Sequence, residues 1–177
     1  MDQLNRVDIE TFKSQDKTPI VLLLDNVRSM HNVGSAFRTA DAFAIERIVL
    51  CGITATPPHR EIEKTALGAT QSVEWIYQKN NVEAVRHLQA EGYKVYAIEQ
   101  AKDSVELQAF LPSPTEKYAL VFGNEVHGVD EELMRIVDGT IEIPQFGTKH
   151  SFNVSVTMGI VLWDLLSKLK FYSTKTI

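Results

Sequence analysis

The sequence has few of the residues that hold disulfide-bonded or metal-bound domains together. Its 177 residues contain one cysteine, Cys51, which excludes an internal disulfide and a cysteine-based zinc site. The run RIVLCG around Cys51 is typical of a small buried core residue. The five histidines show no HExxH pattern or other metal-ligand spacing, so we expect no metal site.

Long apolar runs and an excess of positive charge are also missing. No apolar run approaches the ~20 residues that a membrane span needs, and the polar start MDQLNRVDIE does not resemble a signal peptide. The sequence therefore predicts a cytoplasmic protein with no membrane partner. Lys and Arg total 18 against 23 Asp and Glu, a net charge of −5. This balance disfavours binding of nucleic acid through the overall field, although it is compatible with a local basic patch.

Three motifs of nucleotide binding and hydrolysis are absent as well. The chain contains no GxGxxG, no GxxxxGK[ST] and no GxSxG. A Rossmann dinucleotide site, a P-loop and the nucleophile turn of a serine hydrolase therefore have no support.

Strand-like apolar runs alternate with helical patterns along the chain. The runs VLLL, RIVL and ALVF are continuous, which is typical of parallel strands covered by helices on both faces. The length suits one core, so we predict a single α/β domain with a parallel sheet and helices on both faces. The expected strands are 20–24, 47–50, 73–77, 94–98, 118–122 and 140–143, and the expected helices are 2–14, 33–44, 61–67, 82–91, 130–136 and 153–169.

Polar and glycine-rich residues follow three of the expected strands. They form the segments LDNVRSMHN, FGNEVHG and PQFGTKHSFN. Because ligands of parallel sheets bind beyond the carboxyl ends of the strands, we expect these segments to meet at one site.

The first segment leads into HNVGSAFRTADAF, residues 31–43. Val33, Phe37 and Ala40 recur at helical spacing, so one helix face is expected to be buried. Taken alone, the stretch is compatible with a helix capped by Asn32 and carrying Arg38 as a surface residue.

The second segment, FGNEVHG at 122–128, has two readings. Its Asn and Gly residues are typical of an ordinary turn. Alternatively, Gly123 admits a ligand close to the backbone while Glu125 orients a cationic or hydroxyl partner.

The third segment runs into the last expected helix. Ser151 and Asn153 are both suitable helix caps, but capping does not explain why Ser151, Asn153 and Ser155 alternate with Phe152 and Val154. The amides at such a helix start also favour an anionic group.

The last helix is apolar on two sides. One side carries Val154, Met158, Val161 and Leu165, and another carries Val156, Ile160 and Trp163. A helix with two apolar sides is expected to be covered on both. We favour a homodimer interface, with a thick monomer core as the alternative.

Taken together, these blocks resemble a known family. NVGSAFRTADAF, LVFGNEVHGV and IPQFGTKHSFNVSVTMGI are similar to the three motifs of the SpoU-type (TrmH-like) RNA 2′-O-ribose methyltransferases of the SPOUT class, and EKTALGATQSVEW resembles the segment between the first two. The resemblance covers roughly residues 19–168. It implies a deep trefoil knot near the C-terminus (the SPOUT α/β-knot), a homodimer, and S-adenosylmethionine as cofactor.

The resemblance also implies site residues. Arg38 is expected to be catalytic, with Asn32 and Glu125 holding the guanidinium or the ribose in register. The cofactor pocket is expected to contain Gly123, Glu125, Ile143, Gln145, Ser151 and Asn153. Many relatives have a methionine-like residue after the proline, where this chain has Gln145.

RNA is the expected partner, bound by a local basic rim. Arg28, Arg60, Lys64 and Lys149, together with Arg47, lie on or near loops that flank the three segments, although each is also an ordinary surface side chain. Only about 18 residues precede the first strand. We therefore expect residues 1–177 to be one SPOUT methyltransferase domain, with residues 1–18 as a short extension and no separate RNA-binding domain.

The expected reaction transfers a methyl group from S-adenosylmethionine to a ribose 2′-hydroxyl of tRNA or rRNA. Guanidinium keeps its proton in proteins, so Arg38 is expected to bind a phosphate and stabilise the developing alkoxide. Three alternatives remain. They are a catalytically silent knotted RNA-binding or assembly factor, a SPOUT enzyme that methylates a base nitrogen and needs a carboxylate base, and an unrelated nucleotide-binding α/β module.

Overall fold

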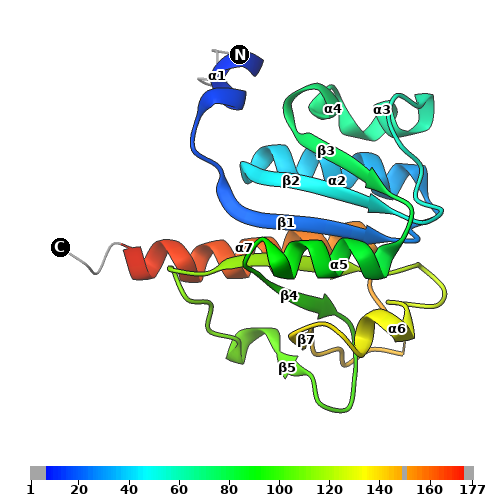
Figure 1. The fold of residues 1–177 in the computed structure, drawn as a ribbon, viewed down its shortest axis with the longest axis vertical. Coiled ribbons are helices and arrows are strands. Elements are labelled where there is room, and N and C mark those ends of the chain that lie inside the picture. The colour runs from blue at the N-terminus through cyan, green and yellow to red at the C-terminus, as the bar shows by residue number, and fades with distance from the viewer. Residues whose placement is uncertain (1–6, 149–150, 174–177) are drawn as a thin grey trace.

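A seven-stranded sheet forms the centre of the molecule (Figure 1). The computed structural model describes residues 7–148 and 151–173. Within these ranges all strand pairings are parallel, in the order β3-β2-β1-β6-β4-β7-β5. The strands are β1 Thr18–Asp25, β2 Ile45–Cys51, β3 Glu74–Gln78, β4 Tyr93–Ile98, β5 Val105–Glu106, β6 Lys117–Phe122 and β7 Gly139–Glu142. The prediction of a parallel α/β sheet is confirmed.

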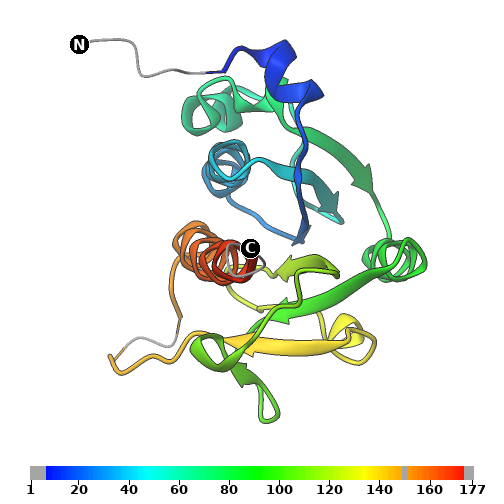
Figure 2. The same ribbon diagram turned by 90° about the vertical axis from the view of Figure 1, so that its left-hand side faces the viewer.

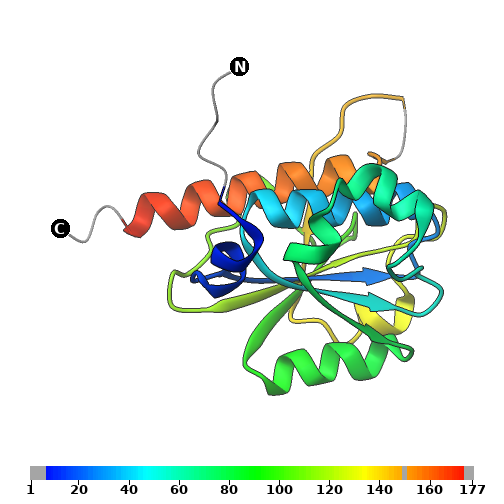
Figure 3. The same ribbon diagram turned by 90° about the horizontal axis from the view of Figure 1, so that it is seen from above.

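Helices cover both faces of this sheet (Figure 3). The helices are α1 Ile9–Ser14, α2 Met30–Ala42, α3 Arg60–Ala66, α4 Ala69–Ser72, α5 Asn81–Ala90, α6 Glu131–Met134 and α7 Val154–Ser173, with a 3₁₀ turn η1 at Leu107–Ala109. Helices α2, α3, α4 and α7 pack on one face, and α5 and α6 pack on the other. No helix in the described ranges is long and apolar enough to cross a membrane.

Strand β1 shows why its sequence is apolar without alternation. Ile20, Leu22 and Leu24 belong to the core under α2 and α7, whereas Val21 and Leu23 belong to the core under α5. All five side chains are fully buried. Both faces of the strand therefore need apolar residues, as expected for a central parallel strand.

Helix α2 begins earlier than the sequence pattern indicates. Its N-cap is Ser29, whose side chain accepts a hydrogen bond from the backbone N–H of Asn32. The interpretation of Asn32 as the cap is therefore wrong. Asn32 lies in the first helical turn, where its buried side chain is free to bond elsewhere.

Differences from the predicted elements are confined to short or terminal segments. Helix α1 covers only the second half of the expected 2–14 helix, and residues 2–6 lie outside the described residues. The four-residue α4, the two-residue β5 and η1 were not predicted, because elements this short show no periodicity.

The chain after β7 turns back toward α2. Figure 2 shows it looping away from the sheet and returning as α7, beside α2 on the same face. Helix α7 therefore starts near the ends of β1 and β6, the central pair of parallel strands.

Candidate functional site

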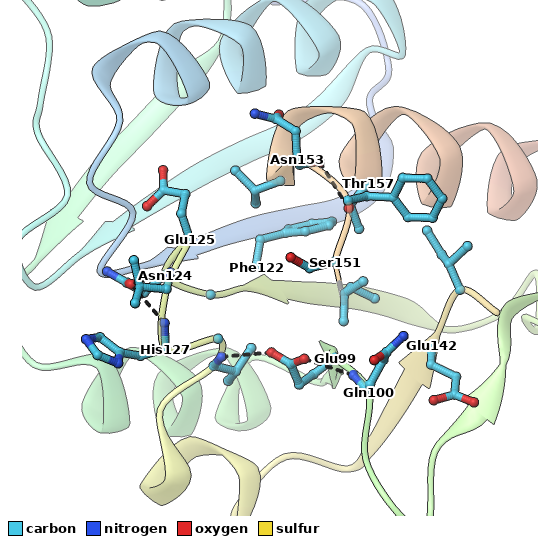
Figure 4. A pocket seen from close by; sticks show the side chains of 18 of the residues that line it. Glu99, Gln100, Phe122, Asn124, Glu125, His127, Glu142, Ser151, Asn153 and Thr157 are labelled. Carbon is cyan, nitrogen blue, oxygen red and sulfur yellow. Dashed lines mark hydrogen bonds between the residues drawn. The ribbon is translucent and has the colours of Figure 1, made fainter. Parts of the chain in front are cut away.

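A cleft of about 720 Å³ lies at the carboxyl ends of β4, β6 and β7 and is bounded by the start of α7 (Figure 4). This is the volume of a typical small-molecule site. The six residues expected in a cofactor pocket all line it: Gly123, Glu125, Ile143, Gln145, Ser151 and Asn153. The second and third polar segments of the sequence thus meet at one edge of the sheet, and hydrogen bonds from Arg28 and Asn32 to Glu125 join the first segment to them.

The loop after β6 is fixed by its own hydrogen bonds. The backbone N–H groups of Asn124 and Gly128 each donate to the other residue's carbonyl at 2.9 Å. The side-chain oxygen of Asn124 accepts from the N–H groups of Val126 and His127, and its amide donates to the carbonyl of Asn26 at 2.8 Å. Asn124 therefore ties this loop to the end of β1.

Gly123 is required by the loop itself. A Cβ added at Gly123 would lie 2.2 Å from the carbonyl carbon of Gly128 and 2.2 Å from the nitrogen of Val129. The space beside the glycine is thus filled by backbone of the same loop. Packing within the loop thus requires a glycine at this position, which also lines the cleft.

Glu125 reaches from this loop to the start of α2. One carboxylate oxygen accepts from the backbone N–H of Arg28 at 2.9 Å, and the other accepts from the N–H of Ser29 at 3.0 Å and from the Asn32 amide at 2.8 Å. Partial burial raises the pKa of Glu125, but the hydrogen bonds from Arg28, Asn32 and Ser29 outweigh it. The net effect is a pKa below its ordinary value.

Asn32 connects all three predicted segments. Its amide donates to Glu125, and its side-chain oxygen accepts from the Asn153 amide at 3.2 Å. The oxygen of Asn153 in turn accepts from the N–H of Ser155 in the first turn of α7. We call this series Glu125–Asn32–Asn153 the bridging chain.

Replacing Glu125 by glutamine is expected to weaken this chain. A glutamine offers one oxygen where the carboxylate offers two, so its NH₂ group faces a backbone N–H. We expect the free energy of unfolding at pH 7 to fall by about 1–2 kcal/mol. This loss is smaller than for a fully buried carboxylate, because the site is partly exposed to water. Thermal and urea unfolding measure this loss.

The same variant has a pH signature. Because the pKa of Glu125 is lowered in the folded protein, its stabilising effect is present above the ordinary carboxyl pKa and is lost as the pH falls through the lowered value. The stability difference between wild type and Glu125→Gln is therefore expected to shrink below about pH 4. A difference that is constant from pH 7 to pH 3 would contradict this assignment.

Arg38 is not part of the cleft. It lies on α2 with an exposed side chain and makes no hydrogen bond or ion pair with any residue in the described ranges. The expected contact of its guanidinium with Asn32 or Glu125 is absent from this part of the chain. The oxygens of Glu125 instead receive the three donors given above.

The basic residues expected to bind RNA fall into three groups. Arg28, Arg60 and Lys64 are exposed, on the β1–α2 loop and on α3, at the edge of the sheet where the cleft lies. Lys64 donates to Glu61, which also contacts His31 at 2.9 Å. Lys149 lies outside the described residues.

Arg47 lies elsewhere. It is near the start of β2, its side chain is 18% exposed, and it forms ion pairs with Glu46 and Glu91. Its guanidinium also lies over the ring of Tyr93. Arg47 therefore belongs to a network at the amino edge of the sheet, away from the cleft.

The sequence analysis missed one wall of the cleft. Glu99 and Gln100, directly after β4, line it, as do Glu142 and Thr157. The rule that ligands bind at the carboxyl ends of strands applies to β4 as well, so the same argument could have found Glu99. Among the described residues, no group of three or more His, Cys, Asp or Glu side chains is arranged to hold a metal ion.

Comparisons with known proteins agree with this geometry. Residues 19–163 match the model of the SpoU rRNA Methylase family. The chain is 34% identical over 164 residues to the 23S rRNA (guanosine-2′-O-)-methyltransferase RlmB of Vibrio parahaemolyticus, covering 92% of this chain and 64% of that protein. The chain thus spans less than two thirds of the length of this curated relative.

Two solved structures share the fold. The TrmH/SpoU tRNA modifying enzyme of A. aeolicus superposes with a TM-score of 0.80 at 27% identity, over 93% of this chain and 82% of the other. An AdoMet-bound rRNA methyltransferase from Sinorhizobium meliloti superposes with a TM-score of 0.77 at 30% identity, over 84% of this chain and 56% of the other. With its motifs, its fold and the match over residues 19–163, this chain belongs to the SpoU rRNA methylase family.

Proposed function

We propose that this protein transfers a methyl group from S-adenosylmethionine to a ribose 2′-hydroxyl of tRNA or rRNA. The observation that carries the proposal is the cleft lined by all six expected residues and linked to α2 by the bridging chain. The names of the similar proteins support both the reaction and the two classes of RNA.

The residues of the cleft fit this cofactor. Ile98, Phe122 and Ile143 offer apolar surface for a purine, and the carboxylates of Glu99 and Glu142 suit a ligand with cationic and hydroxyl groups. When bound, S-adenosylmethionine supplies a methyl group on a positively charged sulfur. Gly123, Glu125, Ile143, Gln145, Ser151 and Asn153 are the residues proposed to hold it.

Arg38 is the proposed catalytic residue. A ribose hydroxyl is a weak nucleophile, so it must be aligned with the methyl group and its developing negative charge must be stabilised. An exposed guanidinium can bind the adjacent phosphate through two N–H groups and lie next to that charge without losing a proton. Asn32 and Glu125 are positioning residues that fix the first turn of α2 against the cleft.

The proposed RNA contacts surround this edge of the sheet. Arg28, Arg60 and Lys64, with Lys149, supply positive charge for the RNA backbone in a chain of net charge −5. We propose that residues 1–177 act as a single cytoplasmic domain of this kind.

The knot of the SPOUT class is also proposed for this chain. Its support is that β7 lies inside the sheet between β4 and β5, while the segment that follows returns to place Asn153 against Asn32. The fold similarity to SpoU structures points the same way.

A homodimer through α7 is proposed as the functional form. One side of α7 is buried in the core, whereas Val156, Ile160 and Trp163 are exposed, and the side chain of Trp163 is among the most exposed apolar ones. Next to them lies an apolar groove that includes Leu107, Ile143 and Pro144. In the proposed dimer, a second copy of the chain covers the exposed side of α7 and this groove.

The double variant Ile160→Glu/Trp163→Glu is expected to be a folded monomer. Two carboxylates cannot be buried in an apolar interface without a large desolvation cost. His87→Glu, an exposed position on α5, is the matched control and should leave the oligomeric state unchanged. Sedimentation velocity measures both; an unchanged dimer in the double variant would place the interface elsewhere.

The function is tested first by calorimetry with S-adenosylmethionine. Absence of binding at millimolar concentration would contradict an enzyme. The second test maps 2′-O-methyl groups across total RNA from a strain that lacks the gene and from its parent. We expect one or more sites to disappear, and an unchanged map would favour the catalytically silent RNA-binding factor.

A further inference from the structure

The wall of the cleft formed by the end of β4 carries a carboxylate that none of the three motifs contains. The Oε1 atom of Glu99 accepts from the backbone N–H of Gln100 at 2.9 Å, and its Oε2 atom accepts from the N–H of Val129 at 3.1 Å (Figure 4). The backbone N–H of Glu99 itself donates to the carbonyl of Ile141 at 3.1 Å. The carboxylate is thus fixed by backbone groups on two sides.

The neighbouring glycine fixes the carboxylate further. Gly128 has a φ of +71°, and a Cβ added there would lie 2.2 Å from Oε2 of Glu99. The carboxylate therefore occupies the space in which any other residue at 128 would place its side chain. Its position is set before a ligand arrives.

Each oxygen of Glu99 keeps unused acceptor capacity. A carboxylate oxygen accepts about two hydrogen bonds, and each oxygen here has one from the backbone. No Lys, Arg or His in the described ranges forms an ion pair with Glu99. The remaining capacity is thus available to a ligand in the cleft, whose lining includes Glu99.

The other carboxylates of the cleft are less suited to a diol. The oxygens of Glu125 already accept three hydrogen bonds at the start of α2. The side chain of Glu142 forms no hydrogen bond or ion pair with another residue of the described ranges, so its carboxylate is not held in one orientation. Two adjacent hydroxyls need two acceptor oxygens held at a fixed spacing, as in dinucleotide sites where an acidic residue after a strand binds a ribose.

We propose that Glu99 binds the ribose of the cofactor, its two carboxylate oxygens accepting hydrogen bonds from the 2′- and 3′-hydroxyls. This inference rests on the proposed function for the identity of the cofactor. It assigns Glu99 a direct contact with the cofactor, in contrast to the positioning roles of Glu125 and Asn32.

Calorimetry with three probes tests the contact without measuring turnover. S-adenosylmethionine, S-adenosylhomocysteine and 5′-methylthioadenosine all carry the ribose, but the second lacks the sulfonium charge and the third lacks both that charge and the amino-acid group. We expect Glu99→Gln to weaken all three by a similar factor of about 10 to 100, the value of a hydrogen bond to a charged group. Glu74→Gln, which removes an exposed carboxylate on β3 that does not line the cleft, is the matched control and should leave all three affinities unchanged.

Analogues of S-adenosylhomocysteine that lack the 2′- or the 3′-hydroxyl isolate the contact itself. The wild type should bind each deoxy analogue more weakly than S-adenosylhomocysteine. Glu99→Gln should bind the analogues and S-adenosylhomocysteine with similar affinity, because this variant already lacks the carboxylate that accepts from the missing hydroxyl. Should Glu99→Gln fail to fold, Glu99→Asp carries the same comparison, since it keeps the charge and displaces the oxygens by one methylene.

Three results would overturn the inference. If Glu99→Gln weakens only S-adenosylmethionine, Glu99 contacts the sulfonium. If it weakens both S-adenosylmethionine and S-adenosylhomocysteine and spares 5′-methylthioadenosine, Glu99 contacts the amino-acid group. Unchanged affinity for all three probes would remove Glu99 from the cofactor site. If the wild type binds none of the probes, the proposed function itself fails, and the two failures are thereby distinguished.

Discussion

Arg38→Ala is expected to reduce methyl transfer by about 10²–10³-fold, the usual cost of removing one group that stabilises transition-state charge. The melting temperature and the affinity for S-adenosylmethionine should stay close to wild type, because the side chain is exposed, makes no bond within the described residues and does not line the cleft. Single-turnover assays with RNA, together with calorimetry, measure the two effects separately.

Arg38→Lys separates charge from geometry. Lysine keeps the positive charge but cannot bind a phosphate through two N–H groups of one plane. We expect this variant to stay at least about tenfold below wild type. Near-normal turnover would show that charge alone suffices and would refute the bidentate contact.

A matched substitution on the basic rim controls for loss of RNA binding. Lys64→Ala removes one charge from α3, which should raise the KM for RNA and weaken its salt dependence, with kcat little changed. If Arg38→Ala also raises KM and leaves kcat little changed, Arg38 binds RNA and is not the catalytic residue.

Gly34→Ala is expected to cause the largest loss of stability. A Cβ at this position would lie 2.1 Å from Oγ1 of Thr65 and 2.2 Å from the carbonyl oxygen of Ile62, because α2 and α3 pack closely there. The Ile62 atom belongs to the backbone of α3 and cannot rotate away, so the two helices must separate. Overpacking of this kind costs about 1–3 kcal/mol, and we expect the upper end.

Two comparisons make the result specific. Alanine has a higher helix propensity than glycine by about 1 kcal/mol, so a net loss can arise only from the contact with α3. Ser35→Ala, the next residue on α2, is the control and should be close to neutral. Gly34→Ala at or above wild-type stability in urea unfolding would show that α3 moves freely.

The elements that were predictable from sequence are those with a physical signature of their own. The strand at Thr18–Asp25 shows one because both of its faces are buried, and the helix at Asn81–Ala90 shows one because its apolar residues recur on one side and Gly92 follows it at a φ of +89°. The N-cap of α2 was harder to predict from the sequence, because Ser29 and Asn32 are both residue types that cap helices well. Only the contact of Asn32 with Glu125, which is distant in the sequence, decides between them.

The site was predictable as a place but not as a set of contacts. The carboxyl-end rule brought Asn32, Glu125 and Asn153 together, whereas it could not show that Arg38 points to solvent. Buried Asp25 is a similar case. It accepts from the Asn81 amide and from the N–H of Asp130, and burial, the dominant influence, raises its pKa despite these bonds. Such contacts depend on segments far apart in the chain and leave no local pattern.

The bridging chain also bears on the order in which the protein is made. Its two hydrogen bonds join residues 93 and 121 positions apart, so the site has a high contact order. While the residues around Asn153 are still inside the ribosome, the hydrogen bond between Asn153 and Asn32 cannot form. The cleft is therefore completed only after the residues around Asn153 have left the ribosome, and binding of a small ligand to it reports that this long-range contact has formed.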